Sequence, residues 1–245
     1  METALQDRKT ILITGASSGI GEATALHLAA QGHNIVLGAR RIQRLNAILE
    51  KIGATSATAM SKALDVTDLD DFKCFADAAC ERFGRIDVLV NNAGVMPLSM
   101  MQDLRVEEWN RMIDVNLRGV LHGIAVALPV MNRQGSGHII NIASTSAHRV
   151  DPSAAVYCAT KFAVRALSEG LRQENKKVRV TVISPGLTQS ELVEGIEDAA
   201  IKAHVRGMME AAIPASSIAN AIGYAIGQPD DVDVNEIIVR PTAQG

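Results

Sequence analysis

The sequence predicts an α/β protein built on a doubly wound, mainly parallel sheet of about seven strands, with helices on both faces. Short apolar stretches alternate with longer helical patterns along the whole chain, as expected for successive βαβ units. A glycine-rich stretch, Gly15 to Gly21, directly follows the first apolar stretch and precedes a helical pattern. The chain has 245 residues and lacks a Pro/Gly/Ser-rich linker, so we expect one domain over residues 1–245.

The elements of the first half follow from local patterns. We expect the first strand at residues 10–14, followed by the glycine-rich turn and a helix over 22–31. The second strand spans 34–39, and the third ends at Leu64-Asp65-Val66. The remaining elements are a helix over 42–52, a helix that Thr67 or Asp68 caps and that runs to Phe83, and a fourth strand at 88–90.

The second half predicts a long helix over 106–133 and another over 155–174. The fifth and sixth strands lie at 138–143 and 178–183. Residues 187–214 form an insertion after the sixth strand, placed to cover the strand ends as a lid. A last helix over 216–227 and a strand over 236–240 complete the sheet.

Composition excludes several classes of function. The net charge is −3 and aromatic residues make up 3% of the chain, which favours neither nucleic acid nor an anionic membrane as a partner. The first nine residues lack an apolar signal core, and we expect no membrane-spanning run. Three cysteines without metal-ligand spacing indicate no metal site and a reducing compartment, so we expect a cytoplasmic protein.

The glycine-rich turn indicates a nucleotide site. Its spacing is G-x-x-x-G-x-G, between a strand and a helix. Glycines let the backbone approach a pyrophosphate, and the helix N-terminus supplies N–H donors. Since parallel strands place ligands at their carboxyl ends, we expect this turn at one edge of the sheet with the other strand-end motifs.

The residues after the second strand indicate which nucleotide. NAD-binding proteins carry an acidic residue there, whereas this chain reads Ala39-Arg40-Arg41. A guanidinium pairs with a 2′-phosphate, so we expect NADP, held by Arg40 with help from Ser17 and Arg41. Asp65 either accepts a hydrogen bond from the adenine amino group or only forms a turn. Asn91-Asn92-Ala93-Gly94 passes a flat ring or forms an ordinary turn.

Tyr157 and Lys161 are the main candidates for chemistry. Their i, i+4 spacing places both side chains on one helix face. We expect the ammonium to lower the pKa of the phenol and make it a proton-transfer group near neutral pH. Alone, such a pair is usually a packing pair. Ser144 follows the fifth strand and is a candidate donor to a substrate oxygen, while Asn116 in the long helix indicates a kink, a bound water or an exposed side chain.

Together these motifs resemble the classical short-chain dehydrogenase/reductase family, whose fold is Rossmann-like. The motifs that carry the resemblance are Thr14 to Gly21, Asp65, Asn91 to Gly94, Asn116, Ser144, Tyr157 with Lys161, and Pro185-Gly186. The stretch Asn235 to Gln244 further resembles bacterial NADP-dependent carbonyl reductases, including hydroxy-acid dehydrogenases and clavulanate-type aldehyde reductases.

The resemblance implies a reversible NADP(H)-dependent reduction of a ketone or aldehyde to an alcohol. It implies that Tyr157 is the acid/base, that Lys161 lowers its pKa and holds the nicotinamide ribose, that Ser144 polarises the carbonyl, and that Asn116 fixes a proton-relay water. Either Thr188 or Ser190 meets the nicotinamide carboxamide. The expected cofactor site comprises Gly15, Ser17, Ser18, Gly19, Ile20, Gly21, Arg40, Arg41, Asp65, Val66, Asn92, Ala93, Gly94, Asn116, Tyr157, Lys161, Pro185, Gly186 and Thr188. The expected substrate pocket comprises Met96, Ser144, Ser146, His148, Tyr157 and Leu187.

Two alternatives remain at the level of sequence. One is a β-keto acyl-thioester reductase, for which Arg149, Lys202 and Arg206 are candidate basic residues at the pocket mouth. The other is a non-catalytic NADP(H)-binding sensor, which predicts a broken catalytic set. The resemblance also implies a homotetramer assembled through the two long helices, which carry small residues such as Ala125, Ala127, Ala163 and Ala166.

Overall fold

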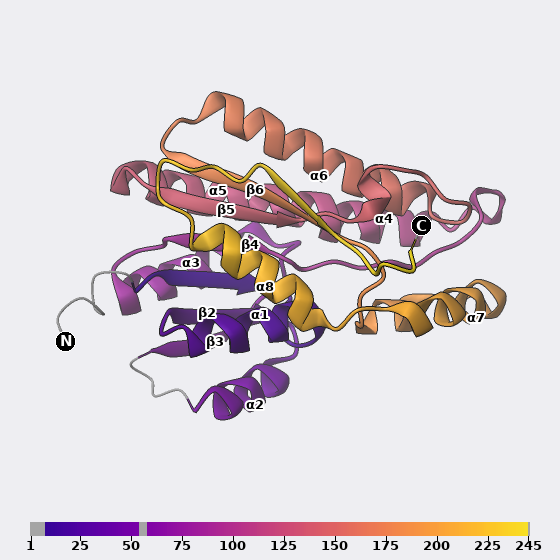
Figure 1. Ribbon diagram of the computed structural model, residues 1–245, viewed down its shortest axis with the longest axis horizontal. Helices are drawn as coiled ribbons and strands as arrows, with labels where there is room; N and C mark the ends of the chain where they lie inside the picture. Colours follow the sequence, from indigo (N-terminus) through magenta and orange to yellow (C-terminus); the bar gives the residue numbers. More distant parts are fainter. Residues whose placement is uncertain (1–7, 54–57, 245) are drawn as a thin grey trace.

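The computed structural model describes residues 8–53 and 58–244 (Figure 1). Within this part of the chain, seven strands form one parallel sheet in the order β3-β2-β1-β4-β5-β6-β7. The predicted doubly wound α/β fold is confirmed. The strands are β1 (Thr10–Thr14), β2 (Asn34–Ala39), β3 (Ala59–Ala63), β4 (Val88–Asn91), β5 (Gly137–Ile142), β6 (Val178–Pro185) and β7 (Glu236–Val239).

Helices cover both faces of the sheet (Figure 1). Side chains of α1, α2 and α8 pack on one face, and those of α3, α5 and α6 pack on the other. The helices are α1 (Gly19–Ala30), α2 (Ile42–Ile52), α3 (Leu69–Phe83), α4 (Val106–Ile113), α5 (Gly119–Gln134), α6 (Ala155–Glu174), α7 (Ala199–Met208) and α8 (Ala215–Ile226).

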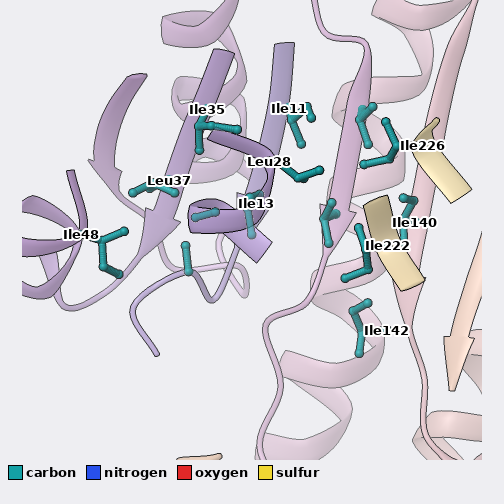
Figure 2. Close-up of a cluster of buried hydrophobic side chains, with 14 of the residues drawn as sticks. Ile11, Ile13, Leu28, Ile35, Leu37, Ile48, Ile140, Ile142, Ile222 and Ile226 are labelled. Carbon is teal, nitrogen blue, oxygen red and sulfur yellow. The ribbon is translucent and has the colours of Figure 1, made fainter. Parts of the chain in front are cut away.

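The strands divide the core because successive side chains point to opposite faces. Ile11 and Ile13 of β1 are fully buried on the side of α1 and α8, in one cluster with Leu28 of α1 and Ile222 of α8 (Figure 2). Leu12 points to the other face, against Phe75 of α3. Burial on both faces explains why the strands read as continuous apolar runs rather than as alternating ones.

The structure corrects the predicted end of the third strand and adds detail to the long helix. The third strand ends at Ala63, before the expected Leu64-Asp65-Val66, because the chain then turns toward the Asp68 cap of α3. The helix expected over 106–133 is present as one helical stretch, Val106–Gln134, which contains a π-turn, Asp114–Arg118. Asn116 lies in this π-turn and is buried, so the exposed alternative is wrong, while the kink stays a prediction.

The expected lid segment, residues 187–214, contains α7 between two short 3₁₀ turns, Glu191–Gly195 and Met209–Ala211. It lies beyond the strand ends, apart from the two helical layers (Figure 1). Its buried Val193 and Val205 join a separate apolar cluster with Tyr157 and Cys158 of α6. The segment is therefore anchored on the helix that carries the candidate catalytic tyrosine.

One helical stretch, Val106–Gln134, is long and apolar enough to cross a membrane by length and composition, although the sequence analysis expected no such run. In this fold Ala127 and Met131 of the stretch are buried against the sheet with residues of α3. The fold thus accounts for part of its apolar character as core packing.

Candidate active site

A cavity of about 1470 Å³ opens at the carboxyl ends of the strands, under the 187–214 segment. This is the edge at which parallel α/β sheets bind ligands. The predicted site residues that line it are Gly15, Ser17, Ser18, Gly19, Ile20, Arg40, Arg41, Asp65, Val66, Asn92, Ala93, Gly94, Met96, Ser144, Ser146, Tyr157, Lys161, Pro185, Gly186, Leu187 and Thr188. Gly21, Asn116 and His148 are not among the lining residues.

The glycine-rich turn forms one wall and has the shape that a dinucleotide needs. Gly15 has φ +63°, and a Cβ there would lie 2.7 Å from the Ala93 Cα. A Cβ on Gly21 would lie 2.5 Å from the Gly15 carbonyl oxygen, so Gly21 acts beneath the turn by allowing the helix to pack closely. Only glycine fits at these two positions, and the backbone of the turn stays open to the cavity.

Asn92 and Thr14 fasten this turn to the neighbouring strand end. The Asn92 side chain donates to the carbonyl oxygens of Thr14 (2.8 Å) and Gly15 (3.2 Å). The Thr14 hydroxyl accepts from the backbone N–H groups of Asn92 and Ala93, both at 3.0 Å. These hydrogen bonds join the ends of β1 and β4. The segment Asn91 to Gly94, which the sequence alone also allowed as an ordinary turn, thus supports the glycine-rich turn.

The predicted phosphate site contains Arg41 rather than Arg40 in contact with Ser17. The Arg41 Nε and Nη2 atoms donate to the Ser17 hydroxyl at 3.2 and 2.9 Å, and Nη2 also donates to the Ser18 hydroxyl at 3.0 Å. Arg40 is exposed, lines the cavity and lies near Asp65. The two arginines thus face different groups, and the contact of Arg40 with a 2′-phosphate stays a prediction.

Asp65 is primarily part of a turn. Its Oδ1 accepts from the Thr67 N–H (3.0 Å) and the Thr67 hydroxyl (2.8 Å). Burial acts to raise the pKa of Asp65, but the Thr67 hydrogen bonds and the Arg40 charge lower it overall. Since Asp65 also lines the cavity, the adenine contact stays a prediction.

Ser144, Tyr157 and Lys161 meet at the opposite end of the cavity. Tyr157 and Lys161 are 7% and 5% exposed, and the Lys161 Nζ lies 5.8 Å from the Tyr157 ring centre and donates to the Ile142 carbonyl at 2.9 Å. Ser144 lies close enough to Tyr157 to lower the pKa of the phenol, against the effect of burial. The Ser144 hydroxyl also accepts from the Ser146 N–H at 3.1 Å, which fixes it at the end of β5.

The expected sign of the tyrosine shift was wrong. Burial raises the pKa of Tyr157 to about 12, although the Ser144 hydrogen bond opposes this. Burial also lowers the pKa of Lys161 to about 8. Because both groups are removed from water, desolvation outweighs the attraction that the i, i+4 spacing suggested. The phenol is therefore protonated at neutral pH, which suits a proton donor.

Asn116 supports the cavity wall from behind. Its side-chain oxygen accepts from the Val95 N–H at 2.8 Å, and its amide donates to the Val95 carbonyl at 2.9 Å and to the Thr160 hydroxyl at 3.2 Å. These contacts hold the chain after Gly94 against the π-turn. The relay water stays a prediction.

His148 was expected in the substrate pocket, but it faces the last strand instead. Its Nε2 lies 2.8 Å from the Glu236 Oε1. The same carboxylate accepts from the Ser184 hydroxyl at 2.8 Å and from Arg165 at 3.1 Å. This network fastens the turn after Ser144 to β7 and α6, so His148 has a supporting position outside the cavity.

The lining residues that sequence reasoning missed include Arg44, Glu191 and Gln244. The Gln244 Oε1 accepts from the Leu187 N–H at 2.8 Å and so holds the start of the 187–214 segment. The Glu191 carboxylate pairs with Arg41 at 2.8 Å and Arg44 at 2.6 Å. Only the position of Gln244 inside the recognised C-terminal stretch gave a sequence signal.

The two candidate hydroxyls for the carboxamide both line the cavity. Thr188 donates to the Gly186 carbonyl at 3.0 Å and is buried. Ser190 lies beside the glycine-rich turn, since a Cβ on Gly19 would come within 3.4 Å of the Ser190 Cβ. The choice between them stays open.

Comparisons with known proteins agree with this geometry. A sequence model of the short chain dehydrogenase family matches residues 9–200. An uncharacterised oxidoreductase of Staphylococcus saprophyticus is 49% identical over 240 residues, which cover 96% of this chain and 97% of that protein.

Two solved structures extend the comparison. The alcohol dehydrogenase of the archaeon Thermococcus sibiricus, complexed with 5-hydroxy-NADP, matches with a TM-score of 0.85 at 32% identity, covering 97% of this chain and 98% of that one. A short chain dehydrogenase/reductase of Burkholderia phymatum in complex with NAD matches with a TM-score of 0.86 at 27% identity, covering 95% and 89%. Proteins of this fold thus bind either form of the nicotinamide cofactor.

Proposed function

This chain belongs to the short-chain dehydrogenase family of oxidoreductases, and on that premise we propose that it reduces a ketone or aldehyde to an alcohol with NADPH. The observation that carries the proposal is the buried group of Ser144, Tyr157 and Lys161 at the end of the cavity remote from Arg41. A carbonyl that enters this end meets two hydroxyl donors and a nearby ammonium.

Tyr157 gives its proton to the substrate oxygen. Its pKa of about 12 keeps the phenol protonated at pH 7, and an oxygen that is becoming an alkoxide is basic enough to take that proton. A bound nicotinamide supplies the hydride. The reverse reaction, alcohol oxidation, needs the phenolate, which burial of Tyr157 disfavours.

Ser144 and Lys161 assist in different ways. The Ser144 hydroxyl is held by the Ser146 N–H and donates to the substrate oxygen as negative charge develops on it. The Lys161 ammonium, one helical turn from Tyr157, stabilises the phenolate that proton transfer leaves behind. Asn116 keeps the wall beside them in place through Val95.

The residues of the other end fit NADP(H). The Gly15 and Gly21 positions leave the backbone accessible to a pyrophosphate, as a side chain there would not. Ala39 stands where an acidic side chain would repel a 2′-phosphate. The Nε and Nη2 donors of Arg41 point to the Ser17 hydroxyl, so both residues can contact a phosphate there. These features favour NADP(H) over NAD(H).

The substrate end favours an uncharged carbonyl compound over a carrier-linked thioester. Met96, Leu187 and Met208 line it and make an adaptable apolar wall. The basic residues that a carrier would need are already paired: Arg149 with Asp151 at 3.3 Å, Lys202 with Glu194 at 3.3 Å, and Arg206 with Glu194 at 2.8 Å. The intact catalytic group also disfavours a non-catalytic sensor.

The test is a turnover assay with purified protein. NADPH and NADH are each offered with a panel of ketones, aldehydes and β-keto thioesters, and cofactor oxidation is followed by absorbance. We expect turnover of ketones or aldehydes with NADPH preferred. Absence of turnover across the panel, a preference for NADH, or a preference for the thioesters contradicts the proposal.

We also propose a homotetramer, as the sequence analysis expected. Leu121 of α5 and Phe162 of α6 are exposed apolar residues on the two long helices, 42% and 39% exposed. Ala127 does not belong to this surface, because it is buried against the sheet. Light scattering at micromolar concentration should give four times the chain mass, and a monomeric mass would refute the assembly.

A further inference from the structure

A second set of charges joins the 187–214 segment to the cofactor end of the cavity. The two Glu191 oxygens are divided between two cations: Oε2 accepts from Arg41 Nη1 at 2.8 Å, and Oε1 accepts from Arg44 Nη1 at 2.6 Å. The residues lie about 150 positions apart in the sequence, and all three line the cavity. The hydrogen bonds from Arg41 and Arg44 lower the pKa of Glu191 to about 2, so the carboxylate is charged at neutral pH.

The position of Glu191 gives this pairing a consequence for the lid. Glu191 begins the 3₁₀ turn Glu191–Gly195, and Val193 of that turn is buried in the apolar cluster around Tyr157. The start of the segment is therefore held twice, by apolar contact with α6 and by charge on α2. Ser190, the preceding residue, lies over Gly19 of the glycine-rich turn.

The charges at this place are shared between competing acceptors. Arg41 directs Nε and Nη2 to Ser17 and Nη1 to Glu191, so two sides of one guanidinium serve two partners. A 2′-phosphate beside Ser17 carries nearly two negative charges close to the Glu191 carboxylate. The phosphate and the Glu191 carboxylate are both negative and repel each other, and both pair with the same two arginines, Arg41 and Arg44. A ribose 2′-hydroxyl, by contrast, carries no charge and does not repel Glu191.

We propose that Glu191 is a latch residue that competes with the 2′-phosphate of NADP(H) for Arg41 and Arg44, so that NADP(H) but not NAD(H) releases the start of the lid. The latch rests on the proposed function, since it requires that the cofactor bind along the glycine-rich turn. It makes Glu191 a determinant of cofactor choice that acts against NADP(H), and it couples that choice to movement of the 187–214 segment.

The first experiment measures binding rather than turnover. Dissociation constants for NADPH and NADH are measured by calorimetry for the wild type, Glu191→Gln and Glu194→Gln. Glu194 is a matched control, because it lies in the same 3₁₀ turn and pairs with Arg206 and Lys202 inside the segment. We expect Glu191→Gln to tighten NADPH about three- to tenfold relative to NADH, as loss of a half-exposed competing carboxylate predicts. Glu194→Gln should leave the ratio unchanged.

The second experiment follows the latch itself by hydrogen–deuterium exchange of residues 190–196. NADPH should speed exchange there relative to NADH in the wild type, and Glu191→Gln should show fast exchange with either cofactor or with none. An unchanged or weakened NADPH preference in Glu191→Gln, or equal exchange with both cofactors in the wild type, overturns the latch. Failure of the proposed function is distinct: in that case the wild type turns over no carbonyl, or binds neither cofactor.

Discussion

The two ends of the cavity hold charged or ionisable groups in opposite environments. At the catalytic end, Tyr157 and Lys161 are 7% and 5% exposed. At the phosphate end, the side chains of Arg41 and Glu191 are 46% and 47% exposed. The first pair has pKa values moved by loss of water, to about 12 and about 8, while the second set is organised by direct pairing.

This difference indicates which residues determine the reaction rate and which determine the affinity for the cofactor. Desolvation sets the protonation states at the catalytic end. Because this end is buried, water does not replace a side chain that is removed there. At the phosphate end, solvent and salt weaken each pairing, so single contacts there tune selectivity more than they support the fold. We therefore expect large changes in rate from the buried end and smaller changes in affinity from the exposed end.

The largest effect should come from Tyr157→Phe. The ring stays in the apolar cluster with Val193 and Cys158, while the proton donor is lost. We expect kcat to fall by about 10²–10⁴-fold, with the NADPH dissociation constant nearly unchanged. The matched control is Tyr224→Phe, since Tyr224 is the other tyrosine of the chain and is 60% exposed. Activity of Tyr157→Phe within a few-fold of the wild type would remove this residue from the mechanism.

The next effect is the loss of reductase activity at high pH. Because the pKa of Lys161 is about 8, its charged fraction falls as pH rises through that value, whereas Tyr157, at about 12, stays protonated. We expect kcat/KM for carbonyl reduction to fall by up to about tenfold per pH unit above pH 8.

Lys161→Arg provides the control for this pH profile, because a guanidinium keeps its charge across the range. Whatever its absolute rate, this variant should move the descending limb to higher pH. A limb that stays near pH 8 in Lys161→Arg would assign the loss to another group.

The sequence predicted where the candidate catalytic residues lie better than it predicted their pKa values. Ser144 follows a strand, and Tyr157 and Lys161 share a helix face, so strand-end geometry and helical spacing were enough to bring them together. Burial depends on how α6 packs against the 187–214 segment, which local spacing does not encode. The sign of the Tyr157 shift was wrong for that reason.

The sequence also did not predict contacts between residues that are far apart in the chain. Nothing near Glu191 in the sequence indicates a partner about 150 residues away in α2. The neighbours Arg40 and Arg41 contact different groups: Arg40 lies near Asp65, whereas Arg41, the N-cap residue of α2, donates to Ser17. His148 was expected in the substrate pocket, but its side chain lies against Glu236 of β7, 88 residues further along the chain.

The third prediction tests which arginine reads the phosphate. Arg41→Ala should weaken NADPH binding about ten- to a hundredfold, because a charge-assisted forked contact is lost, and should leave NADH within about twofold. Arg40→Ala, the neighbouring control, should change NADPH binding only a few-fold, since Arg40 faces Asp65. The ratio of kcat/KM for the two cofactors measures both. A larger effect in Arg40→Ala would return the phosphate site to the residue that the sequence first favoured.

The smallest expected effect is a salt dependence, which distinguishes the phosphate end of the cavity from the catalytic end without any mutation. Salt screens exposed charges over about 10 Å at 0.1 M ionic strength, and less so buried ones. Raising potassium chloride should therefore weaken NADPH binding several-fold through Arg41 and Arg44, which are about half exposed. NADH binding should depend less on salt, because no 2′-phosphate is present. At saturating cofactor, kcat should change little, since Tyr157 and Lys161 are buried.

Equal salt dependence for NADPH and NADH would show that the exposed cations do not bind the 2′-phosphate. A kcat that falls with salt as steeply as the affinity would show that the two ends do not differ as their exposure indicates.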